Sequence, residues 1–332
     1  MLKKSVIALG ALFCIGLGLQ AQAATVIKIG HGANDKLHMH RALLRFEELV
    51  EKGSKGELEI QIYPSSQMGP DREMIEGVQT GVLEMAIPPS SFFAGWDPSF
   101  AVIELPYVYP SKDVALKVLN GPAGDEMLAK LEKQGLVGLG WLENGLRHVT
   151  NNVRPIHSPE DLNGIKLRTM KVPAHVDTFS ALGANPTPMN FGEVYSGLQQ
   201  GVIDGQENPI ALIDSQRFYE VQKHMSLTGH VFTTYVPVIS KYFFDGLSVE
   251  HQALIRSSMH KASDYQQELV NAEEAAQLEG IKKSGVEVVE LSPEQIVQFQ
   301  TLTESVRAKY RAPIGDQAFD DWMAAVKSAS MN

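Results

Sequence analysis

Residues 58–70 read LEIQIYPSSQMGP, and this stretch decides the fold class of the chain. Its first part, up to Tyr63, alternates between apolar and polar side chains, which is the period of a half-buried β-strand. The prolines, serines and glycine that follow are typical of a turn. Residues 71–81 then begin with acidic side chains, as the start of a helix favours. The stretch therefore predicts a strand, a turn and a short helix in succession.

The sequence on either side continues this order. Residues 26–29 indicate an earlier strand, residues 37–51 a helix with apolar residues three and four positions apart, and residues 83–88 a third strand. Strands that alternate with helices form a mostly parallel sheet of the α/β class. The pattern resumes further on and predicts a second α/β unit over about 145–235, with strands at 136–142, 164–170 and 202–204 and helices at 173–182 and 191–200.

The last third of the chain is predicted to be helical. Residues 248–283 contain no proline and place apolar residues along one face at helical spacing. A single helix of this length is longer than one α/β unit needs, so we expect it to cross both units as a brace. Two ordinary helices with a break between them are the alternative. Residues 293–311 and 316–329 are predicted to form two more helices.

The amino terminus has the pattern of a secretory signal peptide. Lys3 and Lys4 precede an apolar stretch over residues 6–19, and an Ala-x-Ala cleavage box ends at Ala23. We therefore expect residues 1–23 to be removed and the protein to lie in the periplasm. Cys14 is the one cysteine of the chain, so the processed protein would have neither disulfides nor cysteine-ligated metals.

Composition and missing motifs exclude several function classes. The 332 residues are 44% hydrophobic and 20% charged, with a net charge of −10 and no block of lysine or arginine, so nucleic-acid binding is not expected. No phosphate-binding loop, zinc-protease motif or nucleophile elbow occurs. His38 and His40 are two positions apart on a predicted helix, where their rings diverge, so no metal site is expected. No cofactor is predicted. A pair of acidic residues that catalyses hydrolysis stays an alternative, although no motif marks one.

Three polar segments lie where predicted strands and helices meet. They are residues 144–151 with Arg147, residues 161–168 with Arg168, and residues 205–209 with Asn208. Open α/β sheets bind ligands beyond the carboxyl ends of their strands, so we expect these segments to meet at one rim. An isolated arginine is also commonly part of a surface ion pair, and that alternative stays open.

A series of motifs carries a resemblance to a known family. The sequence resembles the DctP-type solute-binding proteins of TRAP transporters, the tripartite ATP-independent periplasmic transporters. The similarity extends from about residue 25 to beyond 300, with the motifs in the family's order. They are residues 63–73, 105–107, 161–168, 182–189, 191–195 and 204–209.

This resemblance implies an architecture and a function. It implies an α/β, two-lobe periplasmic-binding-protein-like fold with a long helix spanning both lobes. Lobe I is expected over 24–145 plus about 233–273, and lobe II over 146–232 plus about 274–332. It implies a monomer without catalysis that delivers a small organic anion to the small and large TRAP permease subunits. A secreted α/β enzyme acting on an organic acid, or a sensory binding protein, is the alternative.

The resemblance also implies ligand-binding residues by motif position. Arg168 looks like the family's selectivity arginine, which pairs with the ligand carboxylate. Arg147 looks like the second arginine found in many members, and Asn208 looks like the asparagine that holds the same carboxylate. Further candidates by position are Asp71, Lys171 and Phe191, followed by Trp141 and His31 on neighbouring segments.

The chain departs from the family's pattern at two places. Residues 87–93 carry no charge where some members have a ligand-binding acid, and Gly32 or Ala33 replaces a polar residue near His31. These departures favour a smaller ligand with one dominant anionic group. A C4-dicarboxylate, a 2-oxo or hydroxy acid, or a short sulfonate such as isethionate would fit, because arginine pairs with either kind of oxyanion. Because phenylalanines lie nearby in the sequence, an aromatic acid also stays a candidate ligand.

Overall fold

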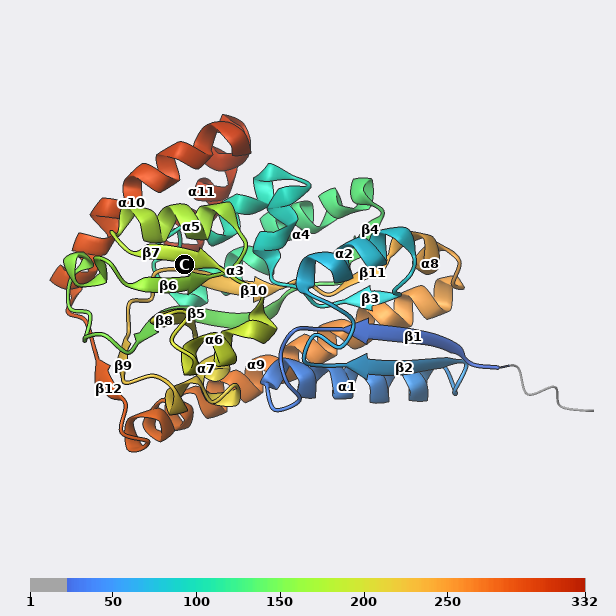
Figure 1. Ribbon diagram of the computed structural model, residues 1–332. Helices are drawn as coiled ribbons and strands as arrows, with labels where there is room; N and C mark the ends of the chain where they lie inside the picture. The colour runs from blue at the N-terminus through green and yellow to red at the C-terminus, as the bar shows by residue number, and fades with distance from the viewer. Residues whose placement is uncertain (1–22, 332) are drawn as a thin grey trace, which may run out of the picture.

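The computed structural model describes residues 23–331 and contains two β-sheets surrounded by helices (Figure 1). The first sheet has the order β2-β1-β3-β11-β4. Its three leading strands are parallel, and β11 is antiparallel to both of its neighbours. The strands are β1 (Thr25–Gly30), β2 (Leu58–Tyr63), β3 (Met85–Ala86), β4 (Leu136–Gly138) and β11 (Val238–Ser240).

The second sheet has the order β12-β9-β5-β8-β6-β7, with β10 also paired to β5. It is mixed, because β5 runs antiparallel to β8, β9 and β10, while β6 runs parallel to β7 and β8. Its strands are β5 (Leu142–Asn151), β6 (Lys166–Thr169), β7 (Asn185–Pro188), β8 (Gly205–Pro209), β9 (His224–Ser226), β10 (Phe232–Tyr235) and β12 (Glu287–Val289).

Helices cover both sheets and close the chain. The α-helices are α1 (His38–Gly53), α2 (Asp71–Thr80), α3 (Lys112–Leu119), α4 (Pro122–Ala129), α5 (Pro173–Ala181), α6 (Val194–Gln199), α7 (Ile210–Ser215), α8 (Lys241–Asp245), α9 (Val249–Lys283), α10 (Pro293–Ile314) and α11 (Asp316–Met331). Short 3-10 helices include η1 (Ser90–Gly95), η2 (Pro98–Glu104) and η5 (Phe191–Glu193). The predicted α/β class with two units is confirmed.

The predicted long helix is confirmed as the single element α9, and the alternative of two broken helices is wrong. The helix has 35 residues, and the Ser248 hydroxyl caps its start by accepting from the His251 N–H. Figure 1 shows α9, in orange, running along both sheets. It packs on α1 beside the first sheet and on α7 and β5 beside the second. Its buried residues Ile255, Met259 and Ala262 form the contact with the first sheet's core.

Three predictions about strand positions are wrong. Residues 144–151 and 205–209 were expected to connect strands and helices, but they form most of β5 and all of β8. The strand predicted at 202–204 is instead a bend that leads into β8. Both strands are almost fully buried and rich in polar side chains. Because the buried side chains of these strands are mostly polar, the sequence lacks the alternation of apolar residues that predicts a strand. Arg147 and Asn208 consequently lie inside the second sheet.

The chain crosses from one sheet to the other as a two-stranded ribbon. Strand β4 continues into β5 through residues 139–141, and β10 continues into β11 through residues 236–237. The two connections run antiparallel, and the Leu139 N–H donates to the Pro237 carbonyl at 2.9 Å. Pairing is present on both sides of this link, because β10 pairs β5 and β11 pairs β4. The ribbon and α9 therefore join the two sheets.

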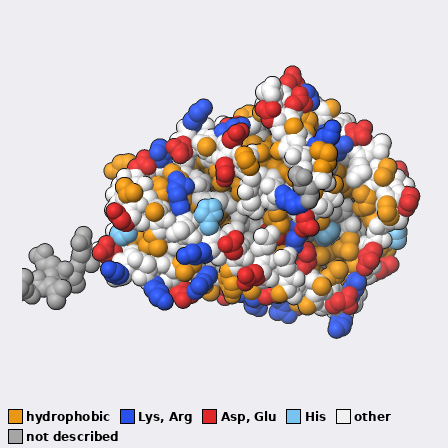
Figure 2. Space-filling view, turned by 180° about the vertical axis from the view of Figure 1, so that it is seen from behind, with side chains coloured by type: hydrophobic (Ala, Val, Ile, Leu, Met, Phe, Trp, Pro, Cys, Tyr) orange, Lys and Arg blue, Asp and Glu red, His pale blue; other side chains and the backbone are white. Residues whose placement is uncertain are grey.

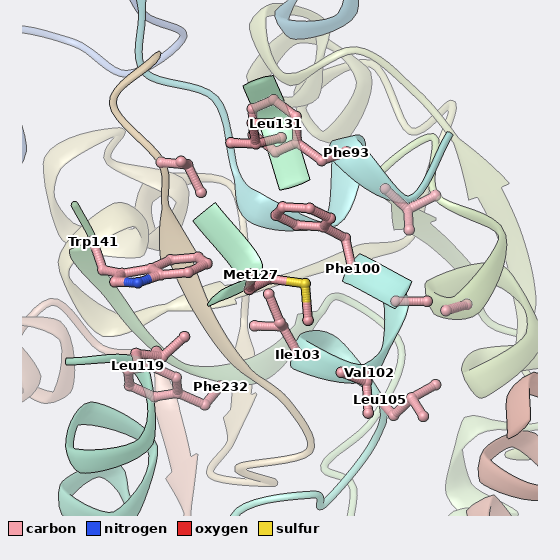
Figure 3. Close-up of a cluster of buried hydrophobic side chains, with 14 of the residues drawn as sticks. Phe93, Phe100, Val102, Ile103, Leu105, Leu119, Met127, Leu131, Trp141 and Phe232 are labelled. Carbon is pink, nitrogen blue, oxygen red and sulfur yellow. The ribbon is translucent and has the colours of Figure 1, made fainter. Parts of the chain in front are cut away.

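Aromatic and aliphatic side chains of η1, η2 and α3 form a large buried cluster. In Figure 3, Phe100 and Ile103 lie near the middle of the view, Phe93 lies above them, and Trp141, Leu119 and Phe232 lie to the left. Helix α11 also packs on this cluster through Trp322 and Val326. It thus contacts elements from the segment expected for lobe I, and the predicted lobe boundaries stay a prediction.

The surface and the termini add two observations. On the face in Figure 2, acidic and basic side chains are interspersed without a large patch of one charge. Within residues 23–331, no helix combines the length and apolar character needed to cross a bilayer. The predicted signal peptide, residues 1–23, lies almost entirely outside the described residues.

Candidate ligand-binding site

Three adjacent strands of the second sheet carry the predicted anion-binding residues. Arg147 lies on β5, Asn208 on β8 and Arg168 on β6, and β8 lies between the other two strands. The pairing register sets Arg147 opposite Pro209 and Arg168 opposite Gln206. Strand pairing therefore brings together two arginines that are far apart in the sequence.

Arg147 is completely buried and already has a counterion. Its Nε and Nη2 donate to the carboxylate of Glu207, with Nη2 and Oε1 2.9 Å apart. Nη2 also donates to the Asn208 Oδ1 at 3.0 Å. Burial alone would raise the pKa of Glu207, but the charge of Arg147 and the hydrogen bonds from His230 and Arg147 hold it below its ordinary value. The pair is therefore an internal ion pair.

Arg168 is also buried, but no carboxylate of residues 23–331 is bonded to it. Its Nε and Nη2 donate to the Met189 carbonyl at 3.1 and 2.8 Å, and its guanidinium lies 5.8 Å from the ring centre of Phe191. The Nη1 has no hydrogen-bond partner among the described residues. Burial, together with the nearby charge of Arg147, lowers the pKa of Arg168 to about 10. Arg168 thus remains charged at neutral pH and lacks a full set of acceptors.

A small cavity, here called the arginine pocket, joins these residues to segments of the first sheet. Five of the eight predicted residues line it, namely Arg147, Arg168, Asn208, Asp71 and Phe191. Its remaining lining is Gly32, Ala33, Pro89, Asn144, Met170, Leu212 and Tyr235. The cavity encloses about 30 Å³, enough for only one or two water molecules. A ligand larger than this needs the residues that line the pocket to move apart.

Asp71 faces the arginines from the first residue of α2. The Asp71 carboxylate lies beside Gly32, where an added Cβ would be 3.4 Å from its Oδ1. Burial raises the pKa of Asp71 to about 6, although the charge of Arg168 opposes this shift. The pocket therefore contains a carboxylate that changes charge near neutral pH.

Replacing Asp71 with asparagine is expected to stabilise the ligand-free protein at about pH 8 and to have little effect at about pH 4. The folded-state pKa of Asp71 lies above its unfolded value, so the folded protein binds the extra proton between these two values. Stability therefore falls as pH rises from about 4 to about 6, and the Asp71→Asn substitution would remove that loss. Melting temperatures of both proteins across this range test the expectation. An equal effect at all pH values would contradict it.

The three other predicted residues lie outside the arginine pocket. Lys171 is exposed and lines a neighbouring outer pocket of about 150 Å³, which shares Asp71, Arg168 and Phe191 with the arginine pocket. Trp141 lies in the apolar cluster of Figure 3. His31 is fully buried, and its Nε2 is 3.0 Å from the His40 Nδ1. The ligand contacts expected for these three residues stay a prediction.

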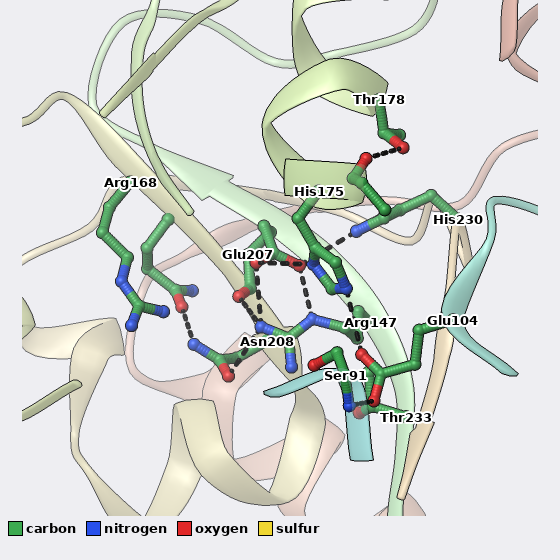
Figure 4. A network of polar contacts seen from close by, with 12 residues as sticks. Ser91, Glu104, Arg147, Arg168, His175, Thr178, Glu207, Asn208, His230 and Thr233 are labelled. Atoms are coloured by element: carbon green, nitrogen blue, oxygen red, sulfur yellow. Dashed lines mark hydrogen bonds and ion pairs between the residues drawn. The ribbon is translucent and has the colours of Figure 1, made fainter. Parts of the chain in front are cut away.

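A network of buried polar groups continues behind Arg147 (Figure 4). The His230 Nε2 lies 3.0 Å from the Glu207 carboxylate, which can only accept, so this nitrogen carries the proton. The His175 Nε2 lies 3.0 Å from the Glu104 Oε2, and its Nδ1 lies 4.0 Å from Glu207. Since Glu104 belongs to η2 and His175 to α5, the network joins elements that follow different sheets.

Sequence reasoning missed the roles of Glu207, Asn144 and Tyr235. Glu207 lies within a quoted motif, and a glutamate beside an asparagine in an otherwise buried strand could have indicated a counterion for Arg147. Asn144 and Tyr235 line the pocket from β5 and β10. No local sequence signal marks them, because their position depends on the pairing of these two strands.

The chain matches a family model over almost its whole described length. The model is described as "Bacterial extracellular solute-binding protein, family 7", DctP, and it matches residues 29–312. The 2,3-diketo-L-gulonate-binding periplasmic protein YiaO of Escherichia coli is 39% identical over 282 residues, which are 84% of this chain and 86% of that protein.

Solved structures share both the fold and much of the sequence. The sugar acid binding protein DctPAm of Advenella mimigardefordensis, in complex with galactonate, has a TM-score of 0.90 and 32% identity, covering 92% of this chain and 99% of that chain. A TRAP periplasmic solute binding protein of Polaromonas, bound to D-erythronate, has a TM-score of 0.87 and 36% identity, covering 90% of this chain and 98% of that chain.

Proposed function

Because this chain belongs to family 7 of the bacterial extracellular solute-binding proteins, the DctP proteins of TRAP transporters, we propose that it captures a small organic anion and delivers it to a membrane permease. Members of this family bind substrates for transporters. The observation that carries the proposal is the buried Arg168, whose Nη1 has no partner among the described residues. A ligand oxyanion at this atom would supply both an acceptor and a counter-charge.

The charges of the arginine pocket favour a ligand with one anionic group. Arg147 is neutralised by Glu207, so Arg168 is the cation that remains for the ligand. Asp71 places a carboxylate in the same pocket. A second carboxylate on the ligand would be repelled by Asp71, whereas a hydroxyl group would donate a hydrogen bond to it.

We therefore propose a hydroxylated monocarboxylate as the ligand class. The named ligands of two relatives, galactonate and D-erythronate, support this class because each combines one carboxylate with several hydroxyl groups. Isethionate, with one sulfonate and one hydroxyl group, has the same combination of polar groups and stays a prediction. A periplasmic location after removal of residues 1–23 is part of the same proposal.

Galactonate or D-erythronate is expected to bind roughly tenfold or more tightly than succinate at about pH 7.5, because a second carboxylate near Asp71 is unfavourable. Calorimetric titration with these acids and with isethionate measures the difference. Asp71→Asn removes the repelling charge and should reduce the difference in affinity between the hydroxy acids and succinate. Lower pH should also reduce this difference, because Asp71 becomes protonated near pH 6.

Two results of this titration would contradict the ligand class. One is tighter binding of succinate than of either hydroxy acid, and the other is an unchanged preference in Asp71→Asn. Failure of every anion to bind would contradict the transport function itself. A ligand at a hundred times its dissociation constant adds about 2.7 kcal/mol of stability, so a thermal-shift screen extends the search to other anions.

A further inference from the structure

A further hollow lies outside the arginine pocket and next to the outer pocket, between elements that follow different sheets. We propose that this hollow, here called the apolar pocket, is a separate binding site for a small carboxylate with an apolar body. Residues of η1 and η2 form one side, and the start of α5 and the end of α10 form the other. Its volume of about 300 Å³ is in the range of small-molecule sites.

The walls of the apolar pocket favour a hydrophobic body. Phe92 and Ala101 line it from the first side, and Val172 and Pro313 line it from the second. Apolar groups that move from water into such a cavity gain roughly 25 cal/mol for each Å² that they bury. A ring of the size of benzene is therefore a suitable occupant.

Two cations at the exposed end favour an anionic head group. Arg72 and Lys171 line both the apolar pocket and the outer pocket. Arg72 is held in place by Glu76, 3.1 Å from its Nε, and by the ring of Trp96, 5.1 Å from its guanidinium carbon. Lys171 forms no ion pair among the described residues. One carboxylate between these two side chains would gain charge-assisted hydrogen bonds.

Polar groups at the buried end set the orientation of the occupant. Glu104 lines the pocket and is 1% exposed, so a second carboxylate would be repelled there. The hydroxyl of Ser91 is buried in the same wall and has no hydrogen-bond partner among the described residues. An unsatisfied buried hydroxyl is unfavourable and can bond a polar atom of a ligand. The carboxylate therefore points outward, away from Glu104, and the apolar body lies against the inner walls of the pocket.

The start of α5 adds a favourable field on the second side. The helix begins at Pro173 and has no side-chain cap at Val172, and both residues line the pocket. The positive end of the helix dipole stabilises an anion in its neighbourhood. The apolar walls and the two cations are independent observations that indicate the same ligand chemistry, and the Ser91 hydroxyl offers a bond to a polar substituent on the apolar body.

Benzoate tests this proposal, with benzyl alcohol as its uncharged analogue. Calorimetric or NMR titration of the wild type should give a measurable dissociation constant for benzoate and a roughly tenfold weaker one for benzyl alcohol. Ala94 lines the apolar pocket but neither the arginine pocket nor the outer pocket, so Ala94→Phe should fill it and weaken benzoate about tenfold or more. Arg168→Ala should leave benzoate affinity within about threefold.

The opposite effects expected of Ala94→Phe and Arg168→Ala on benzoate binding distinguish the two sites. Loss of benzoate binding in Arg168→Ala with normal binding in Ala94→Phe would assign benzoate to the arginine pocket and overturn the proposal. Absence of benzoate binding to the wild type would also overturn it. Arg72→Gln changes an exposed side chain and should weaken benzoate but not benzyl alcohol, which keeps the test valid if Ala94→Phe fails to fold. None of these outcomes depends on the hydroxy acid proposed for the arginine pocket.

Discussion

Replacing Arg168 with lysine or alanine is expected to weaken ligand binding by about two to four decades while the fold survives. Arg168 donates only to the Met189 carbonyl, and its Nη1 has no partner among the described residues. The ligand would therefore supply the acceptor that this nitrogen lacks, in addition to the nearby charges of Glu207 and Asp71. Lysine keeps the charge but loses the planar fork that holds an oxyanion with two bonds. Calorimetry on both variants, with melting curves of the ligand-free forms, measures the two effects separately.

Arg307 provides a matched control for Arg168. Its Nη1 also donates to a backbone carbonyl, that of Pro106 at 3.0 Å, but it does not line the arginine pocket. Arg307→Ala should lower the melting temperature and leave affinity unchanged. Near-normal affinity in Arg168→Ala would contradict the site, whatever the effect on stability.

Replacing Glu207 with glutamine is expected to lower the free energy of unfolding by about 3–5 kcal/mol. The change leaves Arg147 buried without its counterion, and both side chains are at most 1% exposed. Urea unfolding of the ligand-free protein measures the loss. Glu48→Gln is the control, because the Arg45–Glu48 pair is exposed and should contribute no more than about 1 kcal/mol.

The effect of Glu207→Gln should depend on pH with a defined sign. The pKa of Glu207 is lower in the folded protein than in the unfolded chain, so its contribution is complete above the unfolded value of about 4.5. The contribution is lost as pH falls through the lower folded value. The difference in stability between wild type and variant should therefore narrow in acid. A loss of less than about 1 kcal/mol at neutral pH would show that Arg147 finds another acceptor.

The sequence predicted those parts of the molecule that follow a local pattern. Apolar spacing predicted α9 correctly as one helix, and strand and helix signals predicted two α/β units. The family motifs indicated Arg168, Arg147 and Asn208, and the structure brings all three into one pocket. Their contact with the ligand stays a prediction, which the affinity measurements above test.

The parts that could not be predicted depend on contacts between distant segments. Strands β5 and β8 were mistaken for loops because their polar side chains satisfy one another inside the sheet. Gln206 continues this network from Asn208 to Thr150, through a bond of 2.9 Å from its Nε2 to the Thr150 Oγ1. A single sequence does not show which distant residues meet. It therefore does not show that Trp141 packs in the apolar cluster or that His31 contacts His40.

The ribbon that joins the two sheets limits how they can move. Two antiparallel strands linked by the bond from Leu139 to Pro237 resist stretching and shear, but they bend readily about the axis across the ribbon. Opening and closing should then approximate a single rotation, which one distance can follow. Residues 24–332 contain no cysteine, so in a protein that begins at Ala24, cysteines introduced at the exposed Val82 and Val202 would be the only thiols that carry spin labels. The population of each state would then be readable as a two-peaked distance distribution.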